Sequence, residues 1–149
     1  MKILICCAAI LLAAATSCCA GSPNVIGLWN TKNNSSKLEI FPCGEKKLCG
    51  KVAWLKNPNF VSADDGPVGA PKFDLKNPDP ALRARPIIGL QVVEGLSDAG
   101  NDRWEHGKCY DPESGNTYRC KMRMTSPEQL EMRGYVGIPL FGRTYVLTR

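Results

Sequence analysis

Two cysteines placed symmetrically about a turn are the feature that most limits how this chain can fold. Residues 111–115 read Asp-Pro-Glu-Ser-Gly, and the arms on either side carry Cys109 and Cys120. Pro, Asp, Ser and Gly favour tight turns, so the segment predicts a β-hairpin. We pair Cys109 with Cys120 and Asp111 with Tyr118 across the two arms, and this register places both sulfur atoms within reach of a disulfide.

A second pair of cysteines fits a second predicted hairpin over residues 36–55. One register puts apolar residues opposite each other on one face and cysteines on the other: Leu38 with Trp54, Ile40 with Val52, and Cys43 with Cys49. Each bridge would close a short loop, and we expect it to stabilise the fold by about 2–3 kcal/mol. Four cysteines allow three connectivities, of which we favour the two local pairs.

Alternating short apolar runs and turn clusters extend over most of the chain. Helical periodicity is nearly absent, so the pattern predicts an all-β domain. About eight antiparallel strands of this length suit a small closed barrel, because closure leaves no exposed sheet edge. We expect the strands at residues 25–31, 36–43, 48–55, 86–94, 103–111, 117–125, 128–136 and 140–148.

Residues 57–85 interrupt this pattern with loop-forming sequence. Asn77-Pro78-Asp79-Pro80 is expected to start one helical turn that runs through Leu82. Connections of this length in a compact domain are usually functional lids or disordered stretches. We therefore treat this loop as one of the two places where a function could lie, the other being the barrel interior.

The first twenty residues have the pattern of a secretory signal peptide. A lysine follows Met1, residues 3–15 are an unbroken apolar run, and small residues precede a cleavage point after Ala20. The run is too short to span a bilayer, which takes about 20 apolar residues. The sequence thus predicts a signal peptide (1–20) and a single β-barrel domain (21–149) exported to the periplasm or the medium.

A second processing route remains open. Residues 15–18, Ala-Thr-Ser-Cys, resemble a bacterial lipobox, although Leu is usual where Ala15 stands. Lipidation of Cys18 would make the protein an outer-membrane lipoprotein, tethered by its lipid without a transmembrane span.

Charge and composition exclude some partners. The formal net charge is +5, and the basic residues are scattered along the chain instead of forming a run. Scattered charge is typical of a solvated surface, so we expect no nucleic-acid partner.

Several motifs in order resemble known families. Gly27-Leu28-Trp29 resembles the Gly-x-Trp signature of lipocalins and related calycin barrels, where a basic residue from the last strand covers the Trp; Arg149 or Arg143 could fill that role. A longer set resembles the exported bacterial family called domain of unknown function 2147: Leu48 to Val52, Asn77 to Pro80, Arg83 to Gly89, Tyr110 to Gly115, Thr117-Tyr118, Arg133 to Gly137 and Gly142 to Thr144.

This second resemblance covers Gly27 to Arg149 and implies a calycin-like barrel in the cell envelope with no assigned reaction. Two positions depart from the family pattern. Cys109 stands where an aliphatic residue is usual, which favours an extra local bridge in this protein. His106 stands where Gly is common, so the family offers no shared chemistry for this histidine.

No catalytic constellation is visible in the sequence. His106 is the single histidine and is expected to be exposed, and the sequence contains no Gly-x-Ser-x-Gly. Asp111 with Glu113 could form a glycosidase pair, but turn chemistry explains both carboxylates better. The acidic residues Asp64, Asp65 and Asp74 do not have EF-hand spacing. The sequence therefore predicts a protein that is not an enzyme and has neither a metal nor a cofactor.

The remaining candidates for binding are aromatic and basic residues expected to face the barrel interior. A small eight-stranded barrel is filled by its own side chains or holds one small ligand. An inward arginine would bind a carboxylate or phosphate group. The predicted ligand-binding residues are Trp29, Trp54, Tyr118, Arg133, Tyr135 and Arg143. We expect a small hydrophobic or amphipathic ligand; the alternative is an envelope protein-interaction module, anchored through Cys18.

Overall fold

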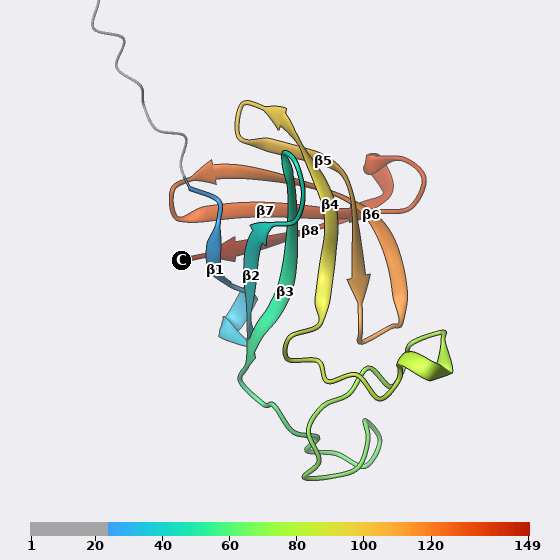
Figure 1. The fold of residues 1–149 in the computed structure, drawn as a ribbon. Coiled ribbons are helices and arrows are strands. Elements are labelled where there is room, and N and C mark those ends of the chain that lie inside the picture. The colour runs from blue at the N-terminus through green and yellow to red at the C-terminus, as the bar shows by residue number, and fades with distance from the viewer. Residues whose placement is uncertain (1–23) are drawn as a thin grey trace, which may run out of the picture.

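The computed structural model describes residues 24–149, which form one closed antiparallel barrel with its strands in chain order (Figure 1). The strands are β1 (Gly27–Asn30), β2 (Ser36–Pro42), β3 (Lys47–Leu55), β4 (Gln91–Gly100), β5 (Arg103–Asp111), β6 (Asn116–Ser126), β7 (Gln129–Tyr135) and β8 (Gly142–Thr148). Short 3₁₀ helices lie between them: η1 (Lys32–Asn34), η2 (Pro80–Leu82) and η3 (Pro139–Phe141). The predicted eight-stranded barrel and the helical turn in the long loop are confirmed.

β4 lies further along the chain than the sequence predicted. We expected this strand at residues 86–94, whereas it spans Gln91–Gly100. Residues 86–90 instead close the long loop. Pro86 has no N–H for a sheet ladder, the Ile87 N–H donates to the Lys72 carbonyl, and the Leu90 N–H donates back to Ile87. Apolar composition alone did not distinguish this turn from a strand.

The β2–β3 hairpin pairs two residues out of the predicted register. Leu38 lies opposite Val52, and Phe41 lies opposite Cys49. The turn is tighter than expected because the Cys43 N–H already donates to the Lys47 carbonyl. The predicted disulfide is nevertheless confirmed: Cys43 and Cys49 are bonded, with their Cα atoms 5.7 Å apart.

The β5–β6 hairpin is displaced from prediction in the same way, with a different result. Cys109 lies opposite Tyr118, and Cys120 lies opposite Gly107. Both cysteines are free thiols in the structure, so the predicted Cys109–Cys120 bridge is not formed. The sulfur atom of Cys120 occupies space that exists because residue 107 is a glycine; a Cβ there would lie 3.1 Å from it.

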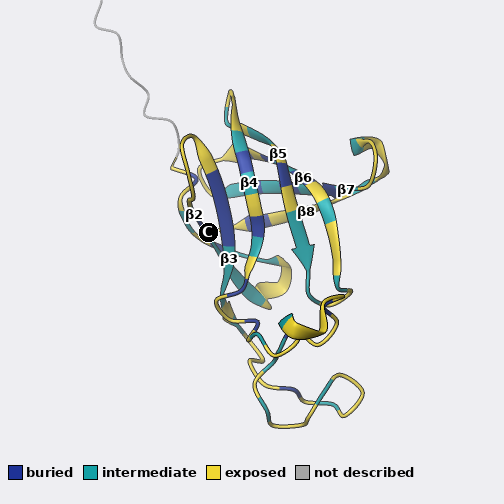
Figure 2. Ribbon diagram, turned by 45° about the vertical axis from the view of Figure 1, so that its right-hand side comes forward, coloured by how far each residue is buried: buried dark blue, intermediate teal, exposed yellow. Residues whose placement is uncertain are grey.

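Apolar side chains fill the centre of the barrel. The most deeply buried positions alternate along the strands, as a barrel with one inner and one outer face requires. Figure 2 shows buried residues on the strands and a mostly exposed long loop. The residues of the core with almost no exposed surface are Trp29, Ile40, Val93, Leu96, Cys120, Met122 and Leu130.

The barrel closes through one short contact between its first and last strands. β1 has four residues, and it pairs with β8 at Asn30 opposite Thr148. β7, in contrast, pairs with β8 along the whole strand, from Thr148 back to Gly142. Among residues 24–149, most of the second edge of β8 therefore has no strand partner, and η1 contacts β8 instead of a longer β1.

Within the described part of the chain, no helix is long and apolar enough to cross a membrane. The predicted signal peptide and the alternative lipidation at Cys18 lie outside the described residues.

Candidate ligand-binding site at the open side of the barrel

One side of the barrel, which we call the sealed side, is built around Trp29. The indole is fully buried, and its Nε1 donates to the Val25 carbonyl oxygen at 2.8 Å. The guanidinium of Arg149 covers the ring at 4.2 Å from its centroid and donates to the Ile26 carbonyl and to the Asn24 carbonyl. Of the two arginines considered from the sequence, Arg149 therefore covers the Trp. Stacking and hydrogen bonds thus close this side of the barrel.

The opposite side of the barrel, which we call the open side, begins where β8 loses its partner. Leu147, Tyr145 and Arg143 share the face of β8 that points into the barrel, because they pair with Leu130, Met132 and Gly134 of β7. Leu147 is buried, but Tyr145 is 56% exposed and Arg143 is exposed. Inward-facing side chains thus become accessible to solvent along β8, and the Arg143 guanidinium has no hydrogen bond or ion pair with residues 24–149.

Two further inward-facing residues form the floor of the open side. A Cβ on Gly134 would lie 3.2 Å from the Cys109 sulfur and 3.8 Å from the Tyr118 Cβ, so both side chains lie over this glycine. Each is half-buried. A hydrogen bond with Cys120 lowers the pKa of the Cys109 thiol, partly opposed by burial, and the same bond together with burial raises the pKa of Cys120. We define the open side by Cys109, Tyr118, Arg143 and Tyr145.

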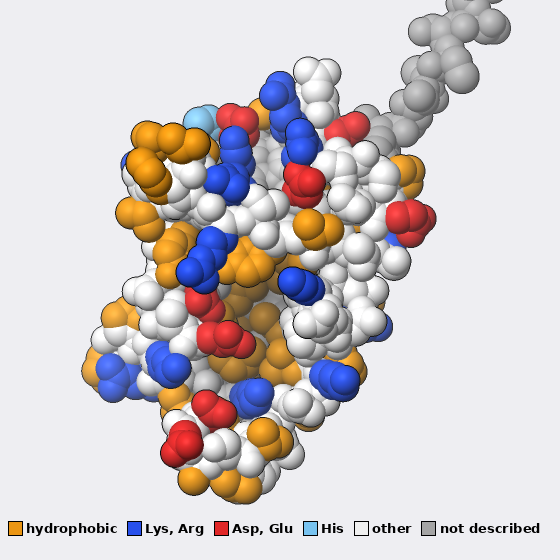
Figure 3. All heavy atoms as spheres, turned by 180° about the vertical axis from the view of Figure 1, so that it is seen from behind, with side chains coloured by type: hydrophobic (Ala, Val, Ile, Leu, Met, Phe, Trp, Pro, Cys, Tyr) orange, Lys and Arg blue, Asp and Glu red, His pale blue; other side chains and the backbone are white. Residues whose placement is uncertain are grey.

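The surface is hollowed on this face of the molecule. Figure 3 shows a depression whose floor is apolar and whose rim carries both basic and acidic side chains. The depression lies between the barrel and the long loop. An apolar floor with a few charged groups at its rim is the usual composition of a small-molecule site.

Four of the six residues predicted to bind a ligand lie away from the open side. Trp29 belongs to the sealed side. Trp54 pairs with Lys37 and lies beneath its ammonium on the outer face, 42% exposed. The inward orientation predicted for Trp54 is wrong because a register shift between Lys37 and Leu38 moves it to the other face.

Tyr135 and Arg133 also lie on the outer face, since they alternate with the buried Met132 and Gly134 along β7. An inward orientation for Tyr135 is therefore wrong. Arg133 donates through Nε to the Pro139 carbonyl at 2.7 Å and through its other nitrogens to Leu140 and Thr144. It fastens η3 to β7. Tyr118 and Arg143 are the predicted residues that the fold brings together.

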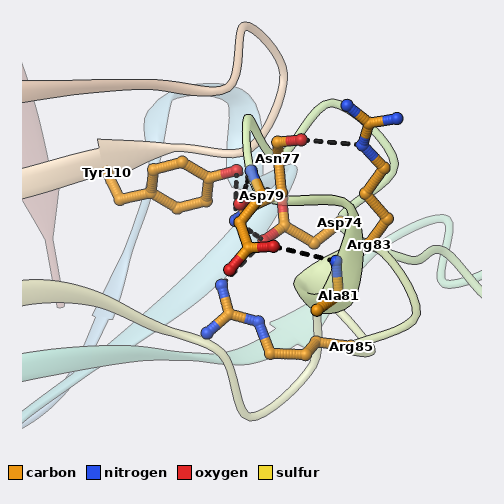
Figure 4. A network of polar contacts seen from close by, with 7 residues as sticks. All are labelled: Asp74, Asn77, Asp79, Ala81, Arg83, Arg85 and Tyr110. Atoms are coloured by element: carbon orange, nitrogen blue, oxygen red, sulfur yellow. Dashed lines mark hydrogen bonds and ion pairs between the residues drawn. The ribbon is translucent and has the colours of Figure 1, made fainter.

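The long loop is fastened beside the open side by a buried carboxylate that the sequence did not single out for this role (Figure 4). Asp74 has no exposed surface. Its two oxygens accept from the Tyr110 hydroxyl at 2.5 Å, from Asn77 Nδ2 at 2.8 Å and from Arg85 at 2.9 Å. Tyr110 comes from β5, so this cluster joins loop to barrel.

The same cluster is unsuited to proton transfer at neutral pH. Burial and the hydrogen bond with Asp74 raise the pKa of Tyr110 to about 12, so its phenol stays protonated. The Asp74 oxygens are all occupied by donors from the protein. We interpret the group as a structural fastening. The alternation of sequence could not reveal it, because its members are 36 residues apart or lie within an irregular loop.

A glycine at the β5–β6 turn completes the attachment of the loop. Gly115 has φ +74°, and a Cβ there would collide with the carbonyl oxygen of Lys76. Only glycine satisfies both the turn and this close approach. Within residues 24–149, no three His, Cys, Asp or Glu side chains gather closely enough to hold a metal ion. His106 is exposed, as expected.

Comparison with known proteins identifies a family and a similar solved structure. Residues 27–149 match the family model described as an uncharacterized protein conserved in bacteria, DUF2147. Among solved structures, a similar one is protein HP1028 from the human pathogen Helicobacter pylori, described as belonging to the lipocalin family. The two share 23% identity with a TM-score of 0.71, over 86% of this chain and 84% of that one. No curated protein matches the sequence significantly.

Proposed function

The chain belongs to the DUF2147 family of bacterial proteins, and we propose that it is an exported carrier that binds a small amphipathic molecule at the open side of its barrel. The supporting observation is the loss of burial along the inward face of β8. Tyr145 is 56% exposed although its cross-strand neighbour Met132 is buried. An inward-facing aromatic residue that meets solvent offers an apolar surface for a ligand.

The filled core limits the size of such a ligand. Trp29, Ile40 and Leu130 have no exposed surface, so the centre of the barrel has no space for a large apolar molecule. The ligand would lie against Tyr145 and Tyr118 and remain partly in contact with water. A short chain or a single ring meets this limit.

Arg143 supplies the polar part of the recognition. Its guanidinium lies on the same face as Tyr145 and is not engaged by any partner among residues 24–149. A guanidinium binds carboxylate and phosphate groups through two parallel hydrogen bonds. We therefore propose an anionic head group on the ligand.

The disulfide and the signal-like sequence support the proposed export. The Cys43–Cys49 disulfide is typical of proteins outside the cytoplasm. Together with the signal-like residues 1–20, it supports export to the periplasm or the medium. The barrel would then carry its ligand through an aqueous compartment.

Binding of octanoic acid, compared with octanol, tests the proposal, because a short chain meets the size limit. We expect the acid to bind at least about tenfold more tightly than the alcohol, because the guanidinium contact is worth more than about 1.4 kcal/mol. Arg143→Gln should remove this preference while leaving the alcohol unaffected. Titration calorimetry or displacement of a fluorescent fatty acid measures both affinities.

Lys47→Gln is the control, since it removes one positive charge at an exposed position in the β2–β3 turn, outside the open side. It should leave both affinities unchanged. Failure of the wild-type protein to bind either compound, or equal losses in the two variants, would rule out the open side as an acid-binding site.

The second candidate is an envelope interaction module that binds a protein partner through the long loop. Val61 and Val68 on this loop are 71% and 64% exposed, which favours a contact surface. Native mass spectrometry of protein purified from its own compartment separates the two functions: a small mass lost on denaturation supports the carrier. The mass of the mature N-terminus distinguishes a start at Gly21 from a lipidated Cys18.

A further inference from the structure

The outer face of β6 concentrates positive charge in an unusual way. Its basic residues lie directly opposite basic residues of the neighbouring strands, so like charges face each other across the sheet. The pairs are Arg119 with Lys108, Lys121 with Arg133, and Arg123 with Arg103. We call these six residues the basic face. They are scattered in the sequence, and only the register of β5, β6 and β7 brings them together.

Like charges in directly opposed positions destabilise a sheet, and few of these charges are compensated. Arg123 has an ion pair with Glu131 at 2.8 Å. Lys121 and Arg103 have none with residues 24–149. Glu105 is the other acidic residue lining a shallow cleft of about 290 Å³ on this face. The positive charge that remains does not stabilise the sheet, which favours a role in binding a partner.

An exposed apolar turn lies next to the basic face. Val136, Ile138, Leu140 and Phe141 are 67%, 55%, 75% and 76% exposed, and we call these four residues the apolar tip. Arg133 connects the two surfaces, because its guanidinium binds the carbonyls of Pro139 and Leu140. Figure 3 shows the apolar atoms of this turn gathered beside basic side chains. Four neighbouring large apolar side chains left in water usually mark an interaction site.

We propose that the basic face and the apolar tip together form a docking surface for the anionic surface of a phospholipid bilayer. The tip enters the interfacial region, and the basic face lies against the head groups, each basic residue contributing to the attraction. Nucleic acid would explain the basic face but not the apolar tip. This docking is independent of any ligand in the barrel.

Vesicle binding tests the proposal with the full mature protein. We expect cosedimentation with vesicles of phosphatidylglycerol and phosphatidylcholine, and none with phosphatidylcholine alone. Added salt should weaken the binding, because exposed charges are screened. Equal binding to both kinds of vesicle, or no binding to either at low salt, would overturn the proposal.

Charge reversal examines the basic face. The double variant Arg103→Glu with Lys121→Glu should bind anionic vesicles at least about tenfold less tightly. Each new carboxylate would face a basic residue, so thermal stability should be unchanged or slightly raised, and loss of binding cannot be ascribed to unfolding. Lys46→Glu with Lys47→Glu is the control, because it makes the same change in net charge in the exposed β2–β3 turn, away from the basic face. This variant should bind anionic vesicles within about twofold of the wild type.

Polar substitution examines the apolar tip. Leu140→Ser with Phe141→Ser keeps every charge, and both positions are exposed, so the fold should be retained. We expect at least a tenfold loss of vesicle binding from removal of the two apolar side chains. If this variant bound as tightly as the wild type while charge reversal abolished binding, the surface would be a general polyanion site and the bilayer would be excluded.

Discussion

The two sides of this barrel each contain an aromatic residue and an arginine, but these residues have opposite roles on the two sides. On the sealed side, Trp29 is fully buried and the guanidinium of Arg149 covers its ring. On the open side, Tyr145 is half in water and Arg143 has no partner among residues 24–149. Where the aromatic ring is buried and the arginine is hydrogen-bonded, the pair closes the barrel. Where the ring is exposed and the guanidinium has no partner, the pair can bind a ligand.

The two sides also differ in how they are held. The sealed side depends on packing inside the barrel. The open side is bordered by a long loop that is held from outside, through the contact of Asp74 with Tyr110. Core packing is cooperative over the whole domain, whereas a surface fastening can open locally. Perturbing each side should therefore give different kinds of instability.

The largest effect is expected from breaking the sealed side. Trp29→Ala should lower the free energy of unfolding by about 3–5 kcal/mol, because it leaves a large cavity and frees Arg149. Urea denaturation followed by circular dichroism measures the change. Trp54→Ala is the matched control: this Trp is 42% exposed on the outer face, and its loss should cost about 1 kcal/mol or less. Equal costs at the two positions would contradict the assignment of a sealed side.

The next effect distinguishes the two cysteine hairpins. Cys43→Ala with Cys49→Ala should lower the free energy of unfolding by about 2–3 kcal/mol, through loss of the closed loop in the unfolded chain. Reducing agent should have the same effect on the wild type and none on this variant. Thiol titration without denaturant should label Cys109 before the buried Cys120. A wild-type protein without any free thiol would show that the second pair is also oxidised.

A smaller, local effect is expected from releasing the loop. Asp74→Asn keeps the shape of the side chain but removes the charge that binds Arg85 and Tyr110. Opening of residues 57–90 should become easier by about 1–2 kcal/mol, with the core unaffected. Hydrogen exchange and limited proteolysis of this segment report the opening. Asp65→Asn, at an exposed position of the same loop, should change neither, and a uniform loss of protection would mean that the loop folds with the barrel.

Alternation and turn chemistry were sufficient to predict seven strands and their approximate ends, because each of these depends on neighbouring residues; the start of β4 was predicted five residues too early. Register was not predictable to better than two residues. A displacement of two leaves Leu38 and Cys120 on the predicted inner face, whereas Trp54, beyond the bulge in β2, moves to the outer face. The exact register of the β2–β3 hairpin depends on its turn, which begins with the hydrogen bond from the Cys43 N–H to the Lys47 carbonyl. The residue pattern does not reveal where that hydrogen bond forms.

The candidate site was predicted less well, for a physical reason. Whether an inward-facing residue binds or merely packs depends on where strand pairing around the barrel is short, and this follows from how few residues of β1 pair with β8. The clustering of basic residues was missed for the same reason. Lys121 and Arg103 are 18 positions apart in the sequence, which reads as scattered, yet both line one cleft. Long-range register, absent from any local pattern, determines both.

The smallest effect concerns the pH dependence of the loop fastening. The pKa of Tyr110 rises from 10.0 to about 12 in the folded protein, through burial and its bond with Asp74. A folded-state pKa that is raised stabilises the protein fully below pH 10, and this contribution is lost as the pH rises through 12. The fastening should therefore hold at neutral pH and weaken only in strong alkali. Absorbance of tyrosinate should show a phase near pH 12 that Tyr110→Phe removes and Tyr145→Phe retains. If Tyr110→Phe left that phase in place, the phenol would not be bound to the loop, and the open side would lack the fastening that distinguishes it from the sealed side.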